Sequence, residues 1–235
     1  VLTFPYLGER IGVPARAGYR KLDLNAPLET HGVPVVALAG TCMEAGKTAA
    51  ACQMVSRMRH RGLTVDVFKA TGVSLRRDIL AMEDAGARNS MIFTDLGIIT
   101  TTRAVGPALT RTMITDISAK KPDVIVFELG DGILGTYGVD SILECDDIRK
   151  ALTGVVLSAN DPVAAWGGVK LLRERFGIEP CAVTGPATDN AVGVEIIRDQ
   201  MKVPAYNALS DGAALGDCVI SAIGLDAKFP VAAAN

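Results

Sequence analysis

The chain has little of what several functional classes need. Aromatic residues make up only 5% of the 235 residues, so aliphatic side chains must supply most of any hydrophobic core. Lysine and arginine number 24 against 26 aspartates and glutamates, and the net charge of -2 lacks the basic excess typical of a nucleic-acid-binding protein. Only two histidines are present, His31 and His60, and neither has a recognisable catalytic neighbour, which argues against a histidine-based triad.

Paired cysteines and long apolar runs are also lacking. The five cysteines form no CxxC pair, so the sequence predicts neither a disulfide framework nor a structural zinc site. No apolar run approaches the about 18 residues of a membrane-spanning helix, and the first residues lack the charged and apolar regions of a signal peptide. We therefore expect a cytoplasmic protein with reduced thiols and with neither a membrane nor a nucleic acid as partner.

From residue 35 onward, short apolar runs rich in Val and Ile alternate with helical patterns. This alternation predicts an α/β fold, a doubly wound and mainly parallel sheet with helices on both faces. The predicted strands are 35–39, 64–68, 91–93, 97–99, 123–128, 154–157, 181–184 and 203–206, and the predicted helices are 47–61, 75–85, 107–120, 141–152, 162–176, 190–201 and 210–223.

The same pattern divides the chain into three parts. Residues 1–33 are rich in Gly and Pro with little periodicity, which predicts an irregular N-terminal arm or the remnant of an upstream domain. Residues 34–225 are predicted to form the α/β domain, and residues 226–235 a loose tail. The chain begins with Val1 instead of Met, as expected of a processed chain or a fragment.

The most specific motif follows the first predicted strand and reads Gly40-Thr-Cys-Met-Glu-Ala-Gly46-Lys47-Thr48. Strand, glycine-bounded loop, Lys-Thr and helix is the layout of a phosphate-binding P-loop, although the first glycine stands one residue earlier than GxxxxGK[ST] requires. Lys47 would reach the β- and γ-phosphates, and the Thr48 hydroxyl would bind Mg²⁺. The residues predicted to bind nucleotide are Gly40, Glu44, Ala45, Gly46, Lys47, Thr48 and Ala49.

Charged residues follow two other predicted strands. Ligands of such sheets bind at the carboxyl ends of the strands, so Lys69, after the second strand, is placed to meet an anionic group. Glu128 ends a buried strand and suits Mg²⁺ or its waters. Asp131 is interpreted equally well as a ligand-facing or a turn residue. Asp78 is a further possible metal carboxylate, although its spacing alone favours a solvated helix position.

Taken in order, these features resemble the dethiobiotin synthetase family and its relatives. Residues 40–48 are similar to the family loop GTDTxVGKT, residues 68–72 to its YKPVxSG motif, and residues 126–132 to its VEGAGG segment. Asp78 stands where the family has a helix carboxylate. The resemblance implies a P-loop NTPase fold over most of the chain from residue 35 onward.

The resemblance also implies an activity. Lys47, Lys69 and Glu128 would be catalytic, and Thr48, Asp78 and Glu128 would hold Mg²⁺, in an ATP-dependent ligase or synthetase that activates a small carboxylate, carbamate or amine. A homodimer is an option, because family members often build the acceptor site across a dimer interface. Three positions depart from the family pattern, so dethiobiotin formation itself is not expected; they are Cys42, Met43 and Gly185.

Two other functions stay open. The first is a nucleotide-switched ATPase or GTPase that acts on a protein partner, as in partition or metal-insertion proteins. Those relatives usually carry an early P-loop lysine where this chain has Cys42. Guanine-binding relatives usually show NKxD, and residues 158–161 lack its lysine, which disfavours GTP. The second is a regulatory P-loop domain of a larger protein.

Overall fold

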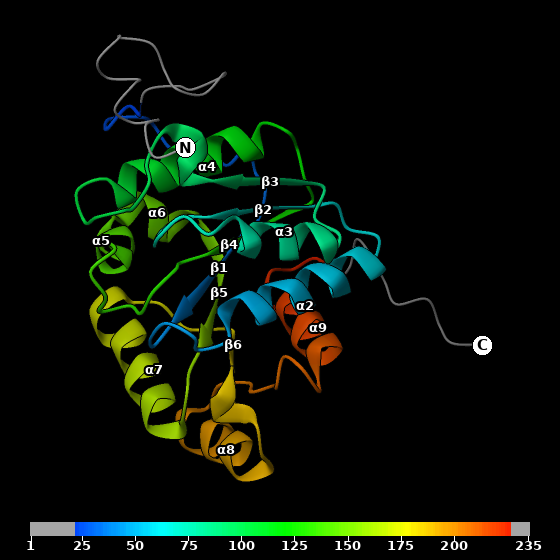
Figure 1. Cartoon of the computed structure of the whole chain (residues 1–235). Helices are drawn as coiled ribbons and strands as arrows, with labels where there is room; N and C mark the ends of the chain where they lie inside the picture. Colours follow the sequence, from blue (N-terminus) through cyan, green and yellow to red (C-terminus); the bar gives the residue numbers. More distant parts are fainter. Residues whose placement is uncertain (1–21, 227–235) are drawn as a thin grey trace.

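The computed structural model describes residues 22–226, and six strands in that part of the chain form one sheet (Figure 1). The strand order is β3-β2-β4-β1-β5-β6, and every pairing is parallel. The predicted α/β sheet is therefore confirmed, and it is wholly parallel. The strands are β1 (Val35–Gly40), β2 (Val65–Lys69), β3 (Asn89–Ile92), β4 (Val124–Glu128), β5 (Leu152–Ser158) and β6 (Ala182–Thr184).

Helices cover both faces of the sheet, as a doubly wound fold requires (Figure 1). One face carries α2 (Lys47–His60), α3 (Arg76–Asp84) and α9 (Gly212–Ala222), and the other carries α4 (Gly106–Ser118), α6 (Asp146–Ala151) and α7 (Pro162–Phe176). The shorter elements are α5 (Val139–Glu144), α8 (Ala191–Ile196), the 3₁₀ turns η1 (Phe93–Leu96) and η2 (Pro186–Thr188), and a π-helical turn η3 (Ile197–Met201). None of the helices within 22–226 combines the length and the apolar character needed to cross a membrane.

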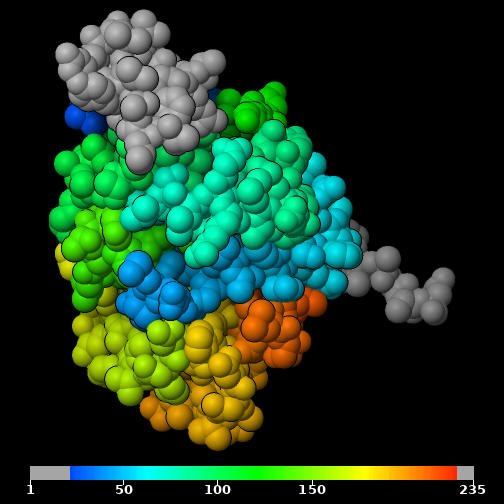
Figure 2. Space-filling view, viewed as in Figure 1, coloured from blue at the N-terminus to red at the C-terminus, as the bar shows by residue number. Residues whose placement is uncertain are grey.

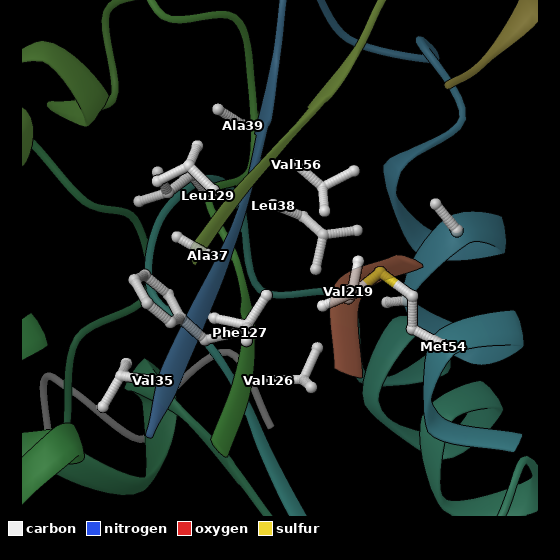
Figure 3. Close-up of a cluster of buried hydrophobic side chains, with 14 of the residues drawn as sticks. Val35, Ala37, Leu38, Ala39, Met54, Val126, Phe127, Leu129, Val156 and Val219 are labelled. Atoms are coloured by element: carbon white, nitrogen blue, oxygen red, sulfur yellow. The ribbon is translucent and has the colours of Figure 1, made fainter. Parts of the chain in front are cut away.

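The core explains why the strand sequences are almost continuously apolar. Successive side chains of a strand point to opposite faces of the sheet. In Figure 3, Leu38 of β1 points toward Met54 of α2 and Val219 of α9, whereas Ala37 lies on the opposite side, with Phe127 of β4. All five side chains are fully buried, so both faces of the central strands select apolar residues.

Three details of the predicted pattern were wrong. Residues 97–99 form no strand, since Gly97 ends η1 with a φ of 79°. Residues 203–206 make only an isolated bridge, between Ala205 and Val183. The helix predicted over 141–152 is broken into α5 and α6, because Cys145 takes an extended backbone (φ -78°, ψ 117°), and β5 already begins at Leu152.

The described part of the predicted N-terminal arm, residues 22–33, contains no helix or strand. It lies against α4, where the Glu29 N–H donates to the Thr115 hydroxyl (3.0 Å) and the Ser118 hydroxyl donates to the Glu29 carbonyl (2.8 Å). The rest of the arm, and all of the predicted tail except residue 226, lie outside the described residues.

A buried carboxylate joins the two strands at the outer edge of the sheet. Asp66 of β2 is fully buried, and it accepts hydrogen bonds from the Arg88 guanidinium at 3.0 and 2.7 Å. The backbone and side-chain N–H groups of Asn89 donate to the same carboxylate at 3.1 Å. A bidentate pair of this kind is strong and directional, so it ties the start of β3 to β2, whose other end carries Lys69.

We predict that Arg88→Ala lowers the free energy of unfolding by about 3 kcal/mol, because it leaves the buried Asp66 carboxylate without its cation. Chemical denaturation of the purified variant measures this loss. Lys170→Ala is the control, since Lys170 and Glu174 form an exposed pair at 3.8 Å that contributes about 0.5 kcal/mol or less. Equal losses in the two variants would contradict the role given to Arg88.

Candidate functional site

The candidate site lies at the carboxyl end of β1. The chain runs from β1 to β3 toward one edge of the sheet and from β4 to β6 toward the other, so β1 lies at the switch point where ligands bind in such sheets. Two segments pack on the loop that follows β1. The Ile133 N–H donates to the Gly40 carbonyl (2.9 Å), and the Thr41 N–H donates to the Ser158 carbonyl (3.0 Å). Figure 2 shows this blue segment at the surface, next to the yellow-green segment of α7.

Lys47 begins α2 and points back over the loop. Its ammonium donates to the Cys42 carbonyl (2.8 Å), and the side chain is almost fully buried. Burial lowers the pKa of Lys47, although Glu128, Cys42 and Asp131 oppose that shift. Gly40 leaves room for the lysine, since a Cβ at that position would lie 2.7 Å from the Lys47 Nζ atom. Lys47 is thus curled over its own loop, at the N-terminus of α2.

The loop backbone is shaped to present N–H groups. Glu44 and Gly46 both have positive φ, 59° and 90°, and Gly46 is the N-cap of α2. The first N–H groups of a helix have no partner within the helix, and they carry partial positive charge. When right-handed and left-handed residues alternate along a loop, successive backbone N–H groups point into a concave site that binds anions such as phosphate. The N-terminus of α2, with Thr48 and Ala49 in its first turn, therefore has the form expected of an anion site.

Glu128, the last residue of β4, contacts the first turn of α2. The Thr48 hydroxyl donates to its Oε2 atom at 2.8 Å, and the glutamate is 3% exposed. Burial raises the pKa of Glu128, while Lys69, Thr48 and Lys47 act in the opposite direction. The predicted metal residues Thr48 and Glu128 are thus in direct contact, although they are 80 positions apart in the sequence.

Lys69, the last residue of β2, lies between two carboxylates. Its ammonium makes a short hydrogen bond with Asp78 of α3 and lies 3.8 Å from the Oε1 atom of Glu128. The side chains of Lys69 and Glu128 are nearly buried and that of Asp78 is 13% exposed. The structure therefore brings Lys47, Lys69, Asp78 and Glu128 together, while their catalytic and metal-binding roles stay predictions.

The donor set fits Mg²⁺ with nucleotide present. Thr48, Asp78 and Glu128 offer hard oxygen ligands, which Mg²⁺ prefers. Within residues 22–226 no group of three or more His, Cys, Asp or Glu side chains forms a metal site on its own. Mg²⁺ usually keeps several waters and is held by one or two carboxylates together with substrate phosphates, so a bound nucleotide would supply part of its ligands.

Gly185 stands where the resembling family has an asparagine that contacts adenine, and the structure explains why this chain has glycine there. Its φ is 90°, and a Cβ there would lie 2.3 Å from the Ala45 carbonyl oxygen and 2.8 Å from that of Ala159. The segment after β6 therefore packs directly on the phosphate loop. No sequence pattern signalled this contact, because it depends on the distance between two loops.

Two further features were not predicted from the motif: a hydrogen bond to Cys42 and the backbone conformation of Asp131. The Asn160 amide donates to the Cys42 sulfur at 3.1 Å, which joins the segment after β5 to the loop. Asp131 has a φ of 84°, which is rare for a residue with a side chain. The glycines on both sides of Asp131 were the available signal that this turn is unusual.

A hollow of about 440 Å³ lies apart from these residues, between α8 and the start of α9. Its lining includes three carboxylates and one guanidinium, those of Asp189, Glu195, Asp211 and Arg198. Arg198 donates to the Ala205 carbonyl (2.6 Å) and lies over the Tyr206 ring. None of the predicted site residues lines it, and its excess of carboxylates disfavours phosphate.

The sequence matches no protein-family model and no curated protein. Solved structures do match. The signal recognition particle receptor FtsY from Elizabethkingia anophelis has 17% identity and a TM-score of 0.56, over 83% of this chain and 67% of that one. A structure of that receptor in complex with GDP has 14% identity and a TM-score of 0.56, over 86% and 67%.

Two further structures extend the likeness. The hydrogenase maturation factor HypB from Archaeoglobus fulgidus has 12% identity and a TM-score of 0.57, over 82% of this chain and 91% of that one. A DUF1611 family protein from Anabaena variabilis has 15% identity and a TM-score of 0.58, over 90% and 63%. At these identities the shared property is the fold. The chain thus shares the doubly wound α/β fold of these proteins, and the matches give no specific support to dethiobiotin synthetase.

Proposed function

We propose that this protein binds a magnesium–nucleoside triphosphate complex and hydrolyses its terminal phosphate. The observation that carries the proposal is the connected set of side chains beside the phosphate loop. Thr48 contacts Glu128, Glu128 lies near Lys69, and Lys69 pairs with Asp78. Glu128 and Lys69 are close enough to Lys47 to act on its charge. Phosphoryl transfer depends mainly on positioning and charge stabilisation, for which this set supplies two lysines, a hydroxyl and two carboxylates.

We favour a nucleotide-dependent switch that acts on a protein partner over a ligase. Two of the structural neighbours have names that describe action on another macromolecule, a signal recognition particle receptor and a hydrogenase maturation factor. The ligase reading needs Lys69 to hold an acceptor, but its ammonium is already paired with Asp78 and lies close to Glu128. Nucleotide hydrolysis stimulated by small carboxylates or amines would restore the ligase reading.

The preferred base is a separate question. The GDP complex of FtsY supports a guanine nucleotide, whereas the segment 158–161 lacks the lysine of the guanine motif. In this segment the Asp161 carboxylate already accepts a hydrogen bond from the Ala164 N–H (2.8 Å) as the N-cap of α7. Calorimetric titrations of ATP and GTP, each with and without Mg²⁺, give the preference directly.

The first prediction concerns Lys47. We expect Lys47→Ala to weaken binding of the preferred magnesium nucleoside triphosphate by about 100-fold, because it removes a charge-assisted hydrogen bond to phosphate. The fold should be unchanged, since burial lowers the pKa of Lys47 and the charge is not a source of stability. Calorimetry measures the affinity, and thermal unfolding tests the fold.

Lys150→Ala is the matched control for Lys47→Ala, since Lys150 is exposed at the end of α6. Full affinity in a folded Lys47→Ala protein would refute the P-loop assignment. Failure of the wild-type protein to bind any of the nucleotides would refute the proposed function as a whole.

The second prediction concerns Glu128. Glu128→Gln should raise the Mg²⁺ concentration needed for nucleotide binding by about 10-fold, because a carboxylate is lost while an oxygen that can accept from Thr48 is kept. Stability at neutral pH should not fall. The pKa of Glu128 is raised in the folded protein, so ionisation of this group destabilises the fold as the pH rises above its unfolded value.

A magnesium titration of nucleotide binding, followed by fluorescence, measures the effect of Glu128→Gln. Glu144→Gln serves as the control, because Glu144 is an exposed carboxylate of α5. If the magnesium requirement of Glu128→Gln equals that of the wild-type protein, Glu128 takes no part in Mg²⁺ binding.

The third prediction concerns Lys69. Lys69→Met should lower the free energy of unfolding by about 3 kcal/mol, because Asp78 and Glu128 lose the cation between them. Added Mg²⁺ should then raise the melting temperature of Lys69→Met more than that of the wild-type protein, as a second cation compensates the carboxylates. If Mg²⁺ raises both melting temperatures equally, the two carboxylates are not a cation site.

A further inference from the structure

Asp131 follows β4 in a backbone conformation that its side chain disfavours. Its φ of 84° lies in the left-handed region, where a Cβ approaches the following carbonyl oxygen, and which few residues other than glycine, asparagine and aspartate adopt. Strained residues of this kind cluster at functional sites, and an observed outlier justifies a functional hypothesis.

The turn that carries Asp131 is held tightly against the phosphate loop. The Ile133 N–H donates to the Gly40 carbonyl at 2.9 Å. The backbone at Gly132 is so close to the loop that a Cβ there would lie 2.7 Å from the Thr41 carbonyl oxygen. The backbone next to Asp131 is therefore fixed against the start of the loop that precedes α2.

The carboxylate of Asp131 is held by a hydrogen bond, but no cationic side chain pairs with it in the described part of the chain. Its Oδ2 atom accepts a hydrogen bond from the Thr136 N–H at 3.2 Å. Across residues 22–226 it takes part in no ion pair, whereas Asp78 and Glu128 both lie within 4 Å of the Lys69 ammonium. Asp131 is also one of the negative charges that act on Lys47, the lysine expected at the γ-phosphate.

We propose that the Asp131 carboxylate orients the water that attacks the terminal phosphate and accepts its proton. This inference rests on the proposed hydrolytic function. The water oxygen bonds to the terminal phosphorus, and the bond from that phosphorus to the bridging oxygen breaks, with its electron pair leaving on the nucleoside diphosphate. The proton of the water passes to Asp131, which releases it to solvent.

The experiment compares Asp131→Asn with the wild-type protein. Asparagine tolerates positive φ and keeps an oxygen for the Thr136 N–H, so it removes the charge without removing the turn. Single-turnover hydrolysis of Mg·ATP and of Mg·GTP should slow by about 100-fold, which is typical of a lost general base. Calorimetric affinity for Mg·ADP and Mg·GDP should not change. Asp199→Asn, at an exposed position of η3, is the control.

Each outcome has a definite meaning. Hydrolysis by Asp131→Asn at the wild-type rate would overturn the role of Asp131 and leave the proposed function intact. Equal losses of diphosphate affinity and hydrolysis rate would also overturn it, since Asp131 would then serve binding. Absence of hydrolysis in the wild-type protein would overturn the proposed function, and this inference with it.

Thermal unfolding supplies a readout that does not depend on activity. Asp131→Gly and Asp131→Ala both lose the hydrogen bond to Thr136, but only glycine relieves the positive φ. We expect the melting temperature of the glycine variant to exceed that of the alanine variant by about 2–4 °C. Equal melting temperatures would contradict the strained backbone on which the argument depends.

Discussion

The arrangement of the site depends on the ion pairs that the Lys69 ammonium makes with two carboxylates. The ammonium lies between Asp78 and Glu128, two carboxylates from different elements that the fold removes largely from water. Ionised carboxylates at such positions need a cation, because desolvation disfavours the charged form. With Lys69 between them, the end of β2, the first turns of α3 and the end of β4 converge, and Glu128 remains in reach of Thr48. The phosphate loop of α2 is thereby tied to the centre of the sheet.

The parallel arrangement of the strands is enough to place these residues at one edge of the sheet. In a parallel sheet all carboxyl ends lie on the same side, so the loop after β1, Lys69 after β2 and Glu128 after β4 meet although they come from distant parts of the sequence. The strand register also brings these residues together, because Lys69 of β2 lies directly opposite Glu128 of β4. Burial of both sheet faces leaves this edge as the natural place for polar chemistry. The fold thus accounts for the position of the site, and the side chains account for its chemistry.

Much of this was predictable from local sequence, and the failures have physical causes. The strand β1 and the helix α2 were predicted correctly, because an apolar run, a glycine-bounded loop and a helical pattern follow one another there; phosphate binding by the loop stays a prediction. The break at Cys145 was missed, since residues 141–152 keep a helical pattern while the extended backbone at Cys145 separates α5 from α6. The pairing of Lys69 with Asp78 was missed because it depends on how α3 packs against β2. The positive φ of Asp131 has only the flanking glycines as a signal, and those fit an ordinary turn equally well.

The contact between Gly185 and the Ala45 carbonyl has a mechanical consequence. The two backbones approach so closely that the clearance is less than one methyl group, and the segment after β6 continues into η2 and α8. Close-packed contacts of this kind transmit displacement and do not absorb it. The phosphate loop therefore cannot tighten or widen at Ala45 without shifting the lower end of the sheet in Figure 1. A displacement of this loop would thus extend to η2 and α8, beside the edge strand β6.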